Sequence, residues 1–476
     1  MNHAISRNSA RLVAAAISIA IPLSAGAAGP CHVAPHSNVG CEFYAVTLPN
    51  AFLDQSAFPF AVRALNARAG VTAHLQISGG GLVGSQSHDV SSGTASDLQL
   101  PWVSALSNSQ STVLLAGAAY HLVADSPLSV WQFNSDSTGT PASPSASNDA
   151  TLLMPVQTAG TSFRVATWPE FQIAGNDYPA QVAIIGTVNA TSVQISAAGG
   201  IQAGAGLTAT GGSAQLNAGD VLLVSSALTA AADFSGAQIT SNSPVVVLTA
   251  HAGTFVPSTD GFGDHLEDAL PPTSELGQDY MLVRPSDPSS GSAAKQMIKL
   301  VGTVDNTNVT YDPAVAGAPG MLSAGQSVVF EAGNDVHVHA DQKFFAAQFM
   351  EGSQTFSGNT NNAGDPSQLT SIPSNRGALV VNFVAPTSFA PVFAQVIGPT
   401  GAGVQVDGVA VTAWNSIGSS GYSAANVSLC CTDFHSATSN QPITVSVYAY
   451  PASFGTSYWY AAGVGPSDDI FGDSFD

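Results

Sequence analysis

The chain repeats itself with a period near 100 residues, and this limits its fold more than any other feature of its 476 residues. Residues 185–193 and 301–309 each place apolar residues on both sides of a turn built from Asn, Asp and Thr, which is the pattern of a β-hairpin. A second segment recurs at residues 126–130, 243–247, 341–345 and 441–445. The intervals are too long for a solenoid repeat and fit a small β-module.

We therefore predict an all-β fold of four antiparallel β-repeats of about 100 residues each. The four blocks span roughly residues 42–135, 150–255, 265–356 and 365–463. Sandwich-like separate modules and a pseudo-symmetric ring would both give these markers, so both arrangements stay open. Residues 135–149 are predicted to be a linker, and residues 58–69 a short helix.

The beginning of the chain has the pattern of a secretory signal. Arg7 and Arg11 precede an apolar run over residues 12–23, and Ala25-Gly26-Ala27 is a small-x-small cleavage site. The apolar run is shorter than the ~20 residues that a membrane span needs. The sequence thus predicts a signal peptide over 1–27, a β-repeat region over 28–463 and a secreted or outer-surface location.

Charged residues are scarce and strongly unbalanced. They make up 9% of the chain, and 10 Lys and Arg stand against 31 Asp and Glu. Nucleic-acid binding depends on Lys and Arg, so this composition excludes it as a function.

The chain has four cysteines, and all are disulfide candidates in an exported protein. Cys31 and Cys41 lie close together in the sequence, and an oxidising compartment favours their pairing. Three connectivities are possible, and the sequence alone does not choose among them. A bond between the adjacent pair would be strained. The candidates are Cys31, Cys41, Cys430 and Cys431.

The region between blocks two and three carries the most specific residues. Asp264-His265-Leu266-Glu267 leads into Leu270-Pro271-Pro272-Thr273, and Leu276-Gly277 precedes Tyr280. With the upstream Asp233-Phe234-Ser235-Gly236 and the later Gly364-Asp365-Pro366, this resembles the IgGFc-binding protein N-terminal domain family. The resemblance covers roughly residues 42–463. One departure is the loop between Gly253 and Asp264, which lacks the cysteine that is frequent in the family.

The resemblance implies extracellular recognition or adhesion, with an extracellular protein or glycan as partner, and no catalysis. Residues 468–476 form an acidic and aromatic tail within the predicted segment 464–476. This tail resembles short tails of secreted proteins of gammaproteobacteria, which implies a bacterial origin.

The densest ionisable cluster of the sequence surrounds the Asp-His motif. Asp264, His265, Glu267 and Asp365 are the binding candidates, although a turn in which Asp264 accepts backbone hydrogen bonds explains the same residues. No HExxH spacing is present, so no metal site is predicted here. His337 and His339 alternate along a strand, with His121 at the comparable place in block one, and two ligands are too few for a metal.

Calcium is the one cofactor for which the sequence offers a place. Asp305-Asn306-Thr307-Asn308 resembles an oxygen-ligand calcium loop, although ordinary turn chemistry explains it too. No Gly-x-Ser-x-Gly elbow or phosphate loop is present. The leading hypothesis is a non-enzymatic secreted or surface binding protein. The alternatives are an extracellular glycan-acting hydrolase and a structural matrix or envelope component.

Overall fold

The structure is a computed structural model that describes residues 1, 33–34, 36–140, 143–145, 147–198, 200–286, 294–355, 364–449 and 456–466. Most of the predicted signal peptide, Cys31 and residues 467–476 lie outside the described residues. Residues 31–476 form one compact unit, and the fold below is that of this unit.

Each repeat is built around one long strand. These strands are β7 (Tyr120–Phe133), β18 (Gln238–Phe255), β25 (Val336–Met350) and β33 (Phe434–Ala449). The first half of each long strand pairs with one set of antiparallel strands and the second half with another, so each module is one continuous sheet of seven or eight strands. We call its two parts the first and the second sheet of the module. In the first module both sheets contribute to one hydrophobic core, with Phe43 and Ile77 from one sheet and Phe60 and Val62 from the other. The all-β prediction is confirmed.

The first sheet of each module contains an opening strand and a hairpin. The opening strands are β1 (Gly40–Ala45), β11 (Gly160–Arg164), β20 (Gly277–Leu282) and β27 (Ala378–Val384). The hairpin strands are β3 (Ala73–Gly79) with β4 (Ser85–Val90), β15 (Thr191–Ser196) with β16 (Gly211–Leu216), β22 (Thr307–Asp312) with β23 (Met321–Leu322), and β29 (Gln405–Val406) with β30 (Val409–Ala410). Side chains of β3 and β15 alternate between buried and exposed, as expected of strands with one face on the core.

The second sheet of each module is more deeply buried. Its strands are β2 (Phe60–Asn66) with β5 (Thr94–Leu100), β14 (Ala180–Gly186) with β17 (Val221–Ser225), β21 (Gln296–Gly302) with β24 (Ser327–Ala332), and β28 (Val392–Pro399) with β32 (Tyr422–Leu429). Every residue of β2 and of β14 is buried, because these strands lie between two neighbours and pack on both faces.

The helix predicted over residues 58–69 is wrong, because this segment forms β2. The apolar residues of this segment suit either structure, and pairing with β5 and β7 decides between them. The remaining elements are short connections: α1 (Ser104–Ser107), β6 (Val113–Leu115), β8 (Gly139–Thr140), β9 (Ser143–Pro144), η1 (Val156–Thr158), β12 (Phe171–Ile173), β13 (Asn176–Tyr178), η2 (Thr273–Glu275), η3 (Ser353–Thr355), η4 (Ser374–Arg376), η5 (Thr387–Phe389) and β31 (Asn415–Ser416).

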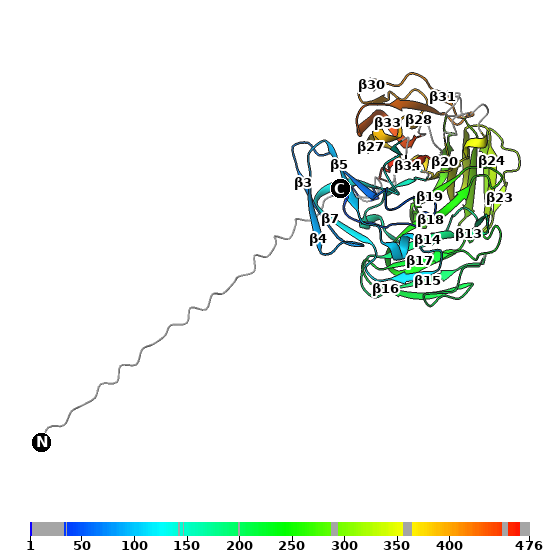
Figure 1. Ribbon diagram of the computed structural model, residues 1–476. Coiled ribbons are helices and arrows are strands. Elements are labelled where there is room, and N and C mark those ends of the chain that lie inside the picture. The colour runs from blue at the N-terminus through cyan, green and yellow to red at the C-terminus, as the bar shows by residue number, and fades with distance from the viewer. Residues whose placement is uncertain are drawn as a thin grey trace. The chain divides into compact units, whose positions relative to one another are not determined.

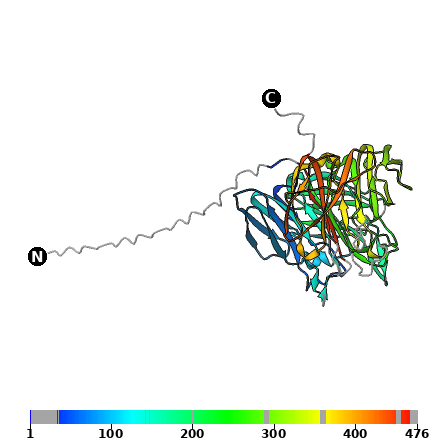
Figure 2. The ribbon, with the colours of Figure 1, turned by 90° about the horizontal axis from the view of Figure 1, so that it is seen from above.

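Four short strands meet at the centre of the unit. They are β10 (Ala150–Leu153), β19 (Gly263–Ala269), β26 (Gln368–Thr370) and β34 (Tyr458–Gly463), and each pairs with the long strand that precedes it. β10 contacts β19, β19 contacts β26, β26 contacts β34, and β34 contacts β10. The modules therefore follow one another around a closed ring, from blue through green and yellow to orange (Figure 1). Figure 2 shows the same strands from above.

This ring changes how the sequence blocks map onto modules. Strands β10, β19 and β26 lie at the start of the second, third and fourth predicted blocks, but they complete the sheet of the preceding module. Neighbouring modules are thereby interlocked. Among the described residues, no helix has the length and apolar character needed to cross a membrane.

Candidate functional site

The centre of the ring is held together by buried carboxylates. The side chain of Asp149, at the start of β10, accepts hydrogen bonds from groups on all four central segments. The donors are the backbone amides of Ala150 (2.9 Å), Glu267 (3.0 Å), Gln368 (3.3 Å) and Trp459 (3.5 Å) and the hydroxyl of Ser367 (2.7 Å). The central strands do not pair with each other in a ladder, so this carboxylate supplies the cross-links that a ladder would provide.

Two acids of β19 extend the same network. Asp264 accepts hydrogen bonds from the hydroxyl of Ser147 and from the amides of Asn148 at 2.9 Å and of His265 at 2.7 Å. Asp268 accepts from the hydroxyl of Thr151 and the amide of Thr370. Each of these carboxylates thus joins β19 to a neighbouring central segment.

Burial shifts the ionisation of the whole centre. Desolvation raises the pKa of Asp149 and Asp264 well above their ordinary values, although their hydrogen bonds oppose the shift. The pKa of Asp268 rises to about 6 for the same reason. Burial also lowers the pKa of His251 and of His265 to about 3, so both imidazoles are neutral at pH 7.

The four binding candidates of the sequence lie in this centre and not at the surface. Asp264, His265 and Glu267 are 0% exposed and Asp365 is 2% exposed. His265 Nε2 lies 3.3 Å from Glu267 Oε2, and the backbone carbonyl of Asp365 accepts a hydrogen bond from Ser457. Side chains buried in this way can hold strands in place, but they cannot touch a macromolecule outside the ring.

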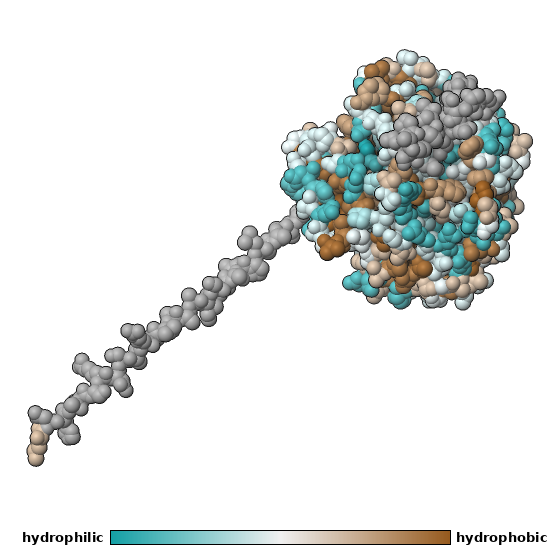
Figure 3. All heavy atoms as spheres, in the orientation of Figure 1, coloured by the Kyte–Doolittle hydropathy of each residue, from teal (hydrophilic) through white to brown (hydrophobic). Residues whose placement is uncertain are grey.

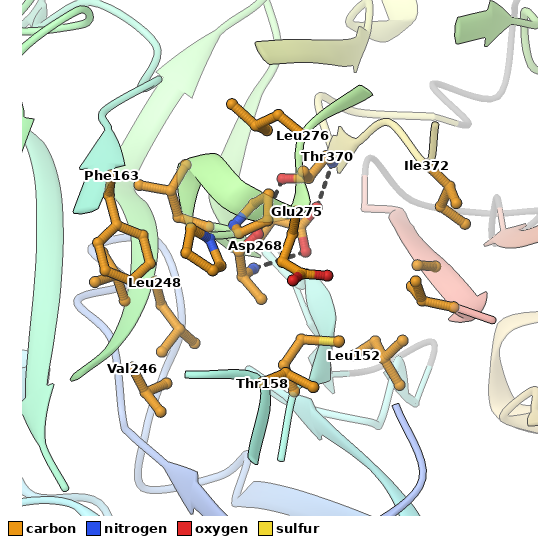
Figure 4. Close-up of a pocket in the computed structure, with 18 of the residues that line it drawn as sticks. Leu152, Thr158, Phe163, Val246, Leu248, Asp268, Glu275, Leu276, Thr370 and Ile372 are labelled. Carbon is orange, nitrogen blue, oxygen red and sulfur yellow. Dashed lines mark hydrogen bonds between the residues drawn. The ribbon is translucent and has the colours of Figure 1, made fainter. Parts of the chain in front are cut away.

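A small apolar pocket lies where the central strands end. Its volume is about 90 Å³, and residues at the ends of all four strands line it, among them Leu153, Leu270, Ile372 and Val464. In Figure 4 apolar side chains such as Leu152, Val246 and Leu248 surround the cavity, and Glu275 projects among them. This pocket combines an apolar wall with three ionisable residues, Asp268, Glu275 and Arg376, and an apolar wall with a few polar groups is a usual composition for a ligand site.

An ion-pair cluster lies at the edge of the pocket. The guanidinium of Arg376, 3% exposed, binds the carboxylate of Glu275 and the backbone carbonyl of His36, and its Nε donates to the carbonyl of Gly465 at 2.9 Å. His36 Nδ1 lies 2.6 Å from Glu275 Oε1. Arg376 therefore ties the first and last described segments of the ring to the third module.

The other histidine and calcium candidates form local pairs. His337 Nε2 and His339 Nδ1 both lie 2.9 Å from the same oxygen of Asp279, and His121 pairs with an acid in the same way in module one. Asp305 accepts a hydrogen bond from the amide of Ala324 at 2.9 Å, which joins its turn to the turn at residues 323–326. In the described part of the chain, no group of three or more His, Cys, Asp and Glu side chains is arranged to hold a metal ion.

The prediction that Cys430 and Cys431 take part in disulfides is wrong, because both are free and exposed. They follow β32 on a surface loop, and adjacent residues are closer together than the usual Cα separation across a disulfide. Cys41 is buried in β1. Since Cys31 is not among the described residues, its pairing with Cys41 stays a prediction.

Two of the scarce basic residues form ion pairs between modules. Lys299 of β21 is fully buried, and its ammonium lies 2.7 Å from a carboxylate oxygen of Asp233 in module two. Burial raises the pKa of Asp233, but the charge and hydrogen bonds of Lys299 outweigh it, so the pKa is lowered overall. Arg63 of module one lies 3.1 Å from Asp433 of module four.

A family model described as IgGFc binding protein matches residues 149–449, which is more than half of the chain. The chain belongs to the IgGFc-binding family. The match begins at Asp149, the carboxylate that bridges the central segments. The chain is 28% identical to the human IgGFc-binding protein over 190 residues, which is 38% of this chain and 3% of that protein. The match thus covers a small fraction of the human protein. No solved structure matches the chain.

Sequence reasoning missed three residues that matter at this site: Asp149, Glu275 and Arg376. A further repeat in the sequence could have indicated the turns that carry Glu275 and Arg376. Pro155 and Pro272 each precede a short 3-10 turn and are followed five residues later by Gly160 and Gly277. Pro373 begins the equivalent turn that carries Arg376.

Proposed function

We propose that this chain is a secreted, non-enzymatic binding protein, and that it recognises an extracellular protein at the pocket where the central strands end. Family membership supports a binding role. The feature that carries the proposal is the pocket itself, because all four central strands terminate at it and its walls come from the family motif Leu270-Pro271-Pro272.

Recognition suits this surface better than catalysis. The ionisable residues of the motif are buried as cross-links, so they are not available to a substrate. On the face shown in Figure 3, hydrophobic residues are scattered among hydrophilic ones. A localised apolar pocket with a polar edge is the kind of feature into which a partner inserts one anchoring side chain.

The partner class to test first is an extracellular glycoprotein. The human relative is named for binding to the Fc part of IgG, so Fc is a rational first probe, beside other secreted glycoproteins, their deglycosylated forms and a glycan array. Fc binding by this chain is part of the proposal.

The test fills the pocket. Ala159 lines it and is half-buried, so Ala159→Phe occupies the space of an incoming side chain. We expect binding to any captured partner to weaken at least tenfold, which is about 1.4 kcal/mol. Ala410→Phe, at an exposed position of β30, is the matched control. Equal affinity of Ala159→Phe and the parent would show that the partner binds elsewhere. Turnover of a polysaccharide would support the hydrolase alternative instead.

A further inference from the structure

The opening strand of module four differs from its three counterparts. Each opening strand has an irregularity in its pairing, and the residue after it is Glu42, Ser162, Asp279 or Val380. The first three are polar. Glu42 and Asp279 bind histidines of their long strands. Val380 is apolar and 54% exposed.

Apolar exposure continues around Val380. The preceding Leu379 is 52% exposed, and Val39, on the segment before β1, is 36% exposed. Among the described strands, β27 pairs only with β33, so its outer edge has no ladder partner. An unpaired strand edge with exposed apolar side chains is a surface that natural proteins usually cover.

A groove runs beside this edge. It has a volume of about 200 Å³, and its walls include Val39, Val380 and residues 463–466. Arg68 also lines it and is exposed. The groove therefore offers apolar walls and one positive charge.

The segment that follows this wall has matching chemistry. Residues 467–476 continue directly from Pro466, which lines the groove, and contain Ile470, Phe471 and Phe475 among four aspartates. At about 3.3 Å per residue, Ile470 and Phe471 are within roughly 13–17 Å of Pro466. The acidic groups suit Arg68, and after the predicted cleavage the chain has few other basic residues.

We propose that residues 467–476 bind in this groove, with Ile470 and Phe471 covering Val380 and Leu379, and the aspartates near Arg68. The segment then acts on module four as a cover for the exposed edge of β27. We favour residues 467–476 over a second copy of the chain as the occupant of the groove. A second copy would lose its independent translational freedom on binding, whereas residues 467–476 are already attached to the wall of the groove at Pro466.

Hydrogen exchange measured by mass spectrometry on the full chain tests the proposal. We expect the amides of 467–476 to exchange about tenfold more slowly in the parent than in Val380→Asp, which corresponds to about 1.4 kcal/mol. Phe471→Ser, on the other side of the proposed contact, should accelerate the exchange of these amides by the same factor. Val409→Asp is the matched control, because Val409 is 71% exposed on β30 of the same module.

Three results would overturn the proposal. The first is equal exchange of 467–476 in the parent and in Val380→Asp, with an unchanged near-ultraviolet circular dichroism spectrum to show that the variant is folded. The second is an equal acceleration in Val409→Asp. The third is slow exchange that depends on protein concentration, which would assign the groove to a second copy.

Discussion

Removing the carboxylate of Asp149 should break the ring at its centre. In Asp149→Ala the amides of Glu267, Gln368 and Trp459 lose an acceptor while they stay buried. The hydroxyl of Ser367 can rotate toward another acceptor, and the amide of Ala150 also loses a bond but belongs to the same segment as residue 149, so the three amides of the other segments give a lower bound on the cost.

The magnitude follows from these three amides. A buried donor left without an acceptor costs about 1–3 kcal/mol, which gives roughly 3–9 kcal/mol in total. Removing a buried carboxylate also relieves part of its desolvation cost, so we expect a net loss of about 3–5 kcal/mol in the free energy of unfolding. Whole domains have about 5–15 kcal/mol, and the variant should therefore be marginal.

Urea unfolding monitored by tryptophan fluorescence measures this loss, because Trp459 and Trp131 are both fully buried near the centre. Asp149→Asn tests the role of the second oxygen, since the side-chain amide nitrogen that replaces it donates hydrogen bonds and cannot accept them. The control is Asp89→Ala, whose side chain is 71% exposed and should change stability by less than about 1 kcal/mol. A loss below about 1 kcal/mol in Asp149→Ala would refute the cross-link reasoning.

Four further outcomes follow from the structure. Gly236→Ala should destabilise the fold severely, because its φ is +87° and the added Cβ would collide with the backbone oxygen of Gly325 in module three; thermal melting measures this loss. Lys299→Met removes the ammonium that pairs with the carboxylate of Asp233, a side chain that is 23% exposed, and should cost about 1–3 kcal/mol in urea unfolding. Burial raises the pKa of Glu351 to about 7, so the folded chain holds a proton that the unfolded chain releases near its ordinary value of 4.5. This group therefore lowers the stability as the pH rises from about 4.5 to 7 and contributes little further change above about 7, so between about pH 5 and 7 the melting temperature of Glu351→Gln should fall less, or rise more, than that of the parent. A thiol reagent added to the native chain should label Cys430 and Cys431, and no label on either would contradict their free, exposed state.

The sequence predicted the fold class because its repeat markers are local. Hairpin turns such as the one at Asn306, whose φ is +58°, depend on a few adjacent residues. The ring depends on contacts between residues far apart, such as Asp149 with Trp459. No periodicity or spacing in a single chain reports such pairs, so the sequence left the packing of the blocks open.

The candidate site shows the same division. The motif around Asp264 could be found from its residue types, but its burial could not, because exposed and buried acids look alike in a sequence. The structure shows that the backbone hydrogen bonds weighed for Asp264 exist: one comes from the adjacent His265, and the other, from Asn148, joins β19 to the segment before β10. The pocket beyond this motif is assembled from all four central strands, and only the folded ring brings them together.

Native-state hydrogen exchange at the centre of the ring tests the account most directly. The amides of Asn148, His265, Glu267 and Thr370 all donate to buried carboxylates. The account predicts that they exchange only through global unfolding, with an opening free energy equal to that from urea unfolding. Exchange of these amides as fast as that of the surface loops would contradict the central claim that the family motif is the closed core of the ring.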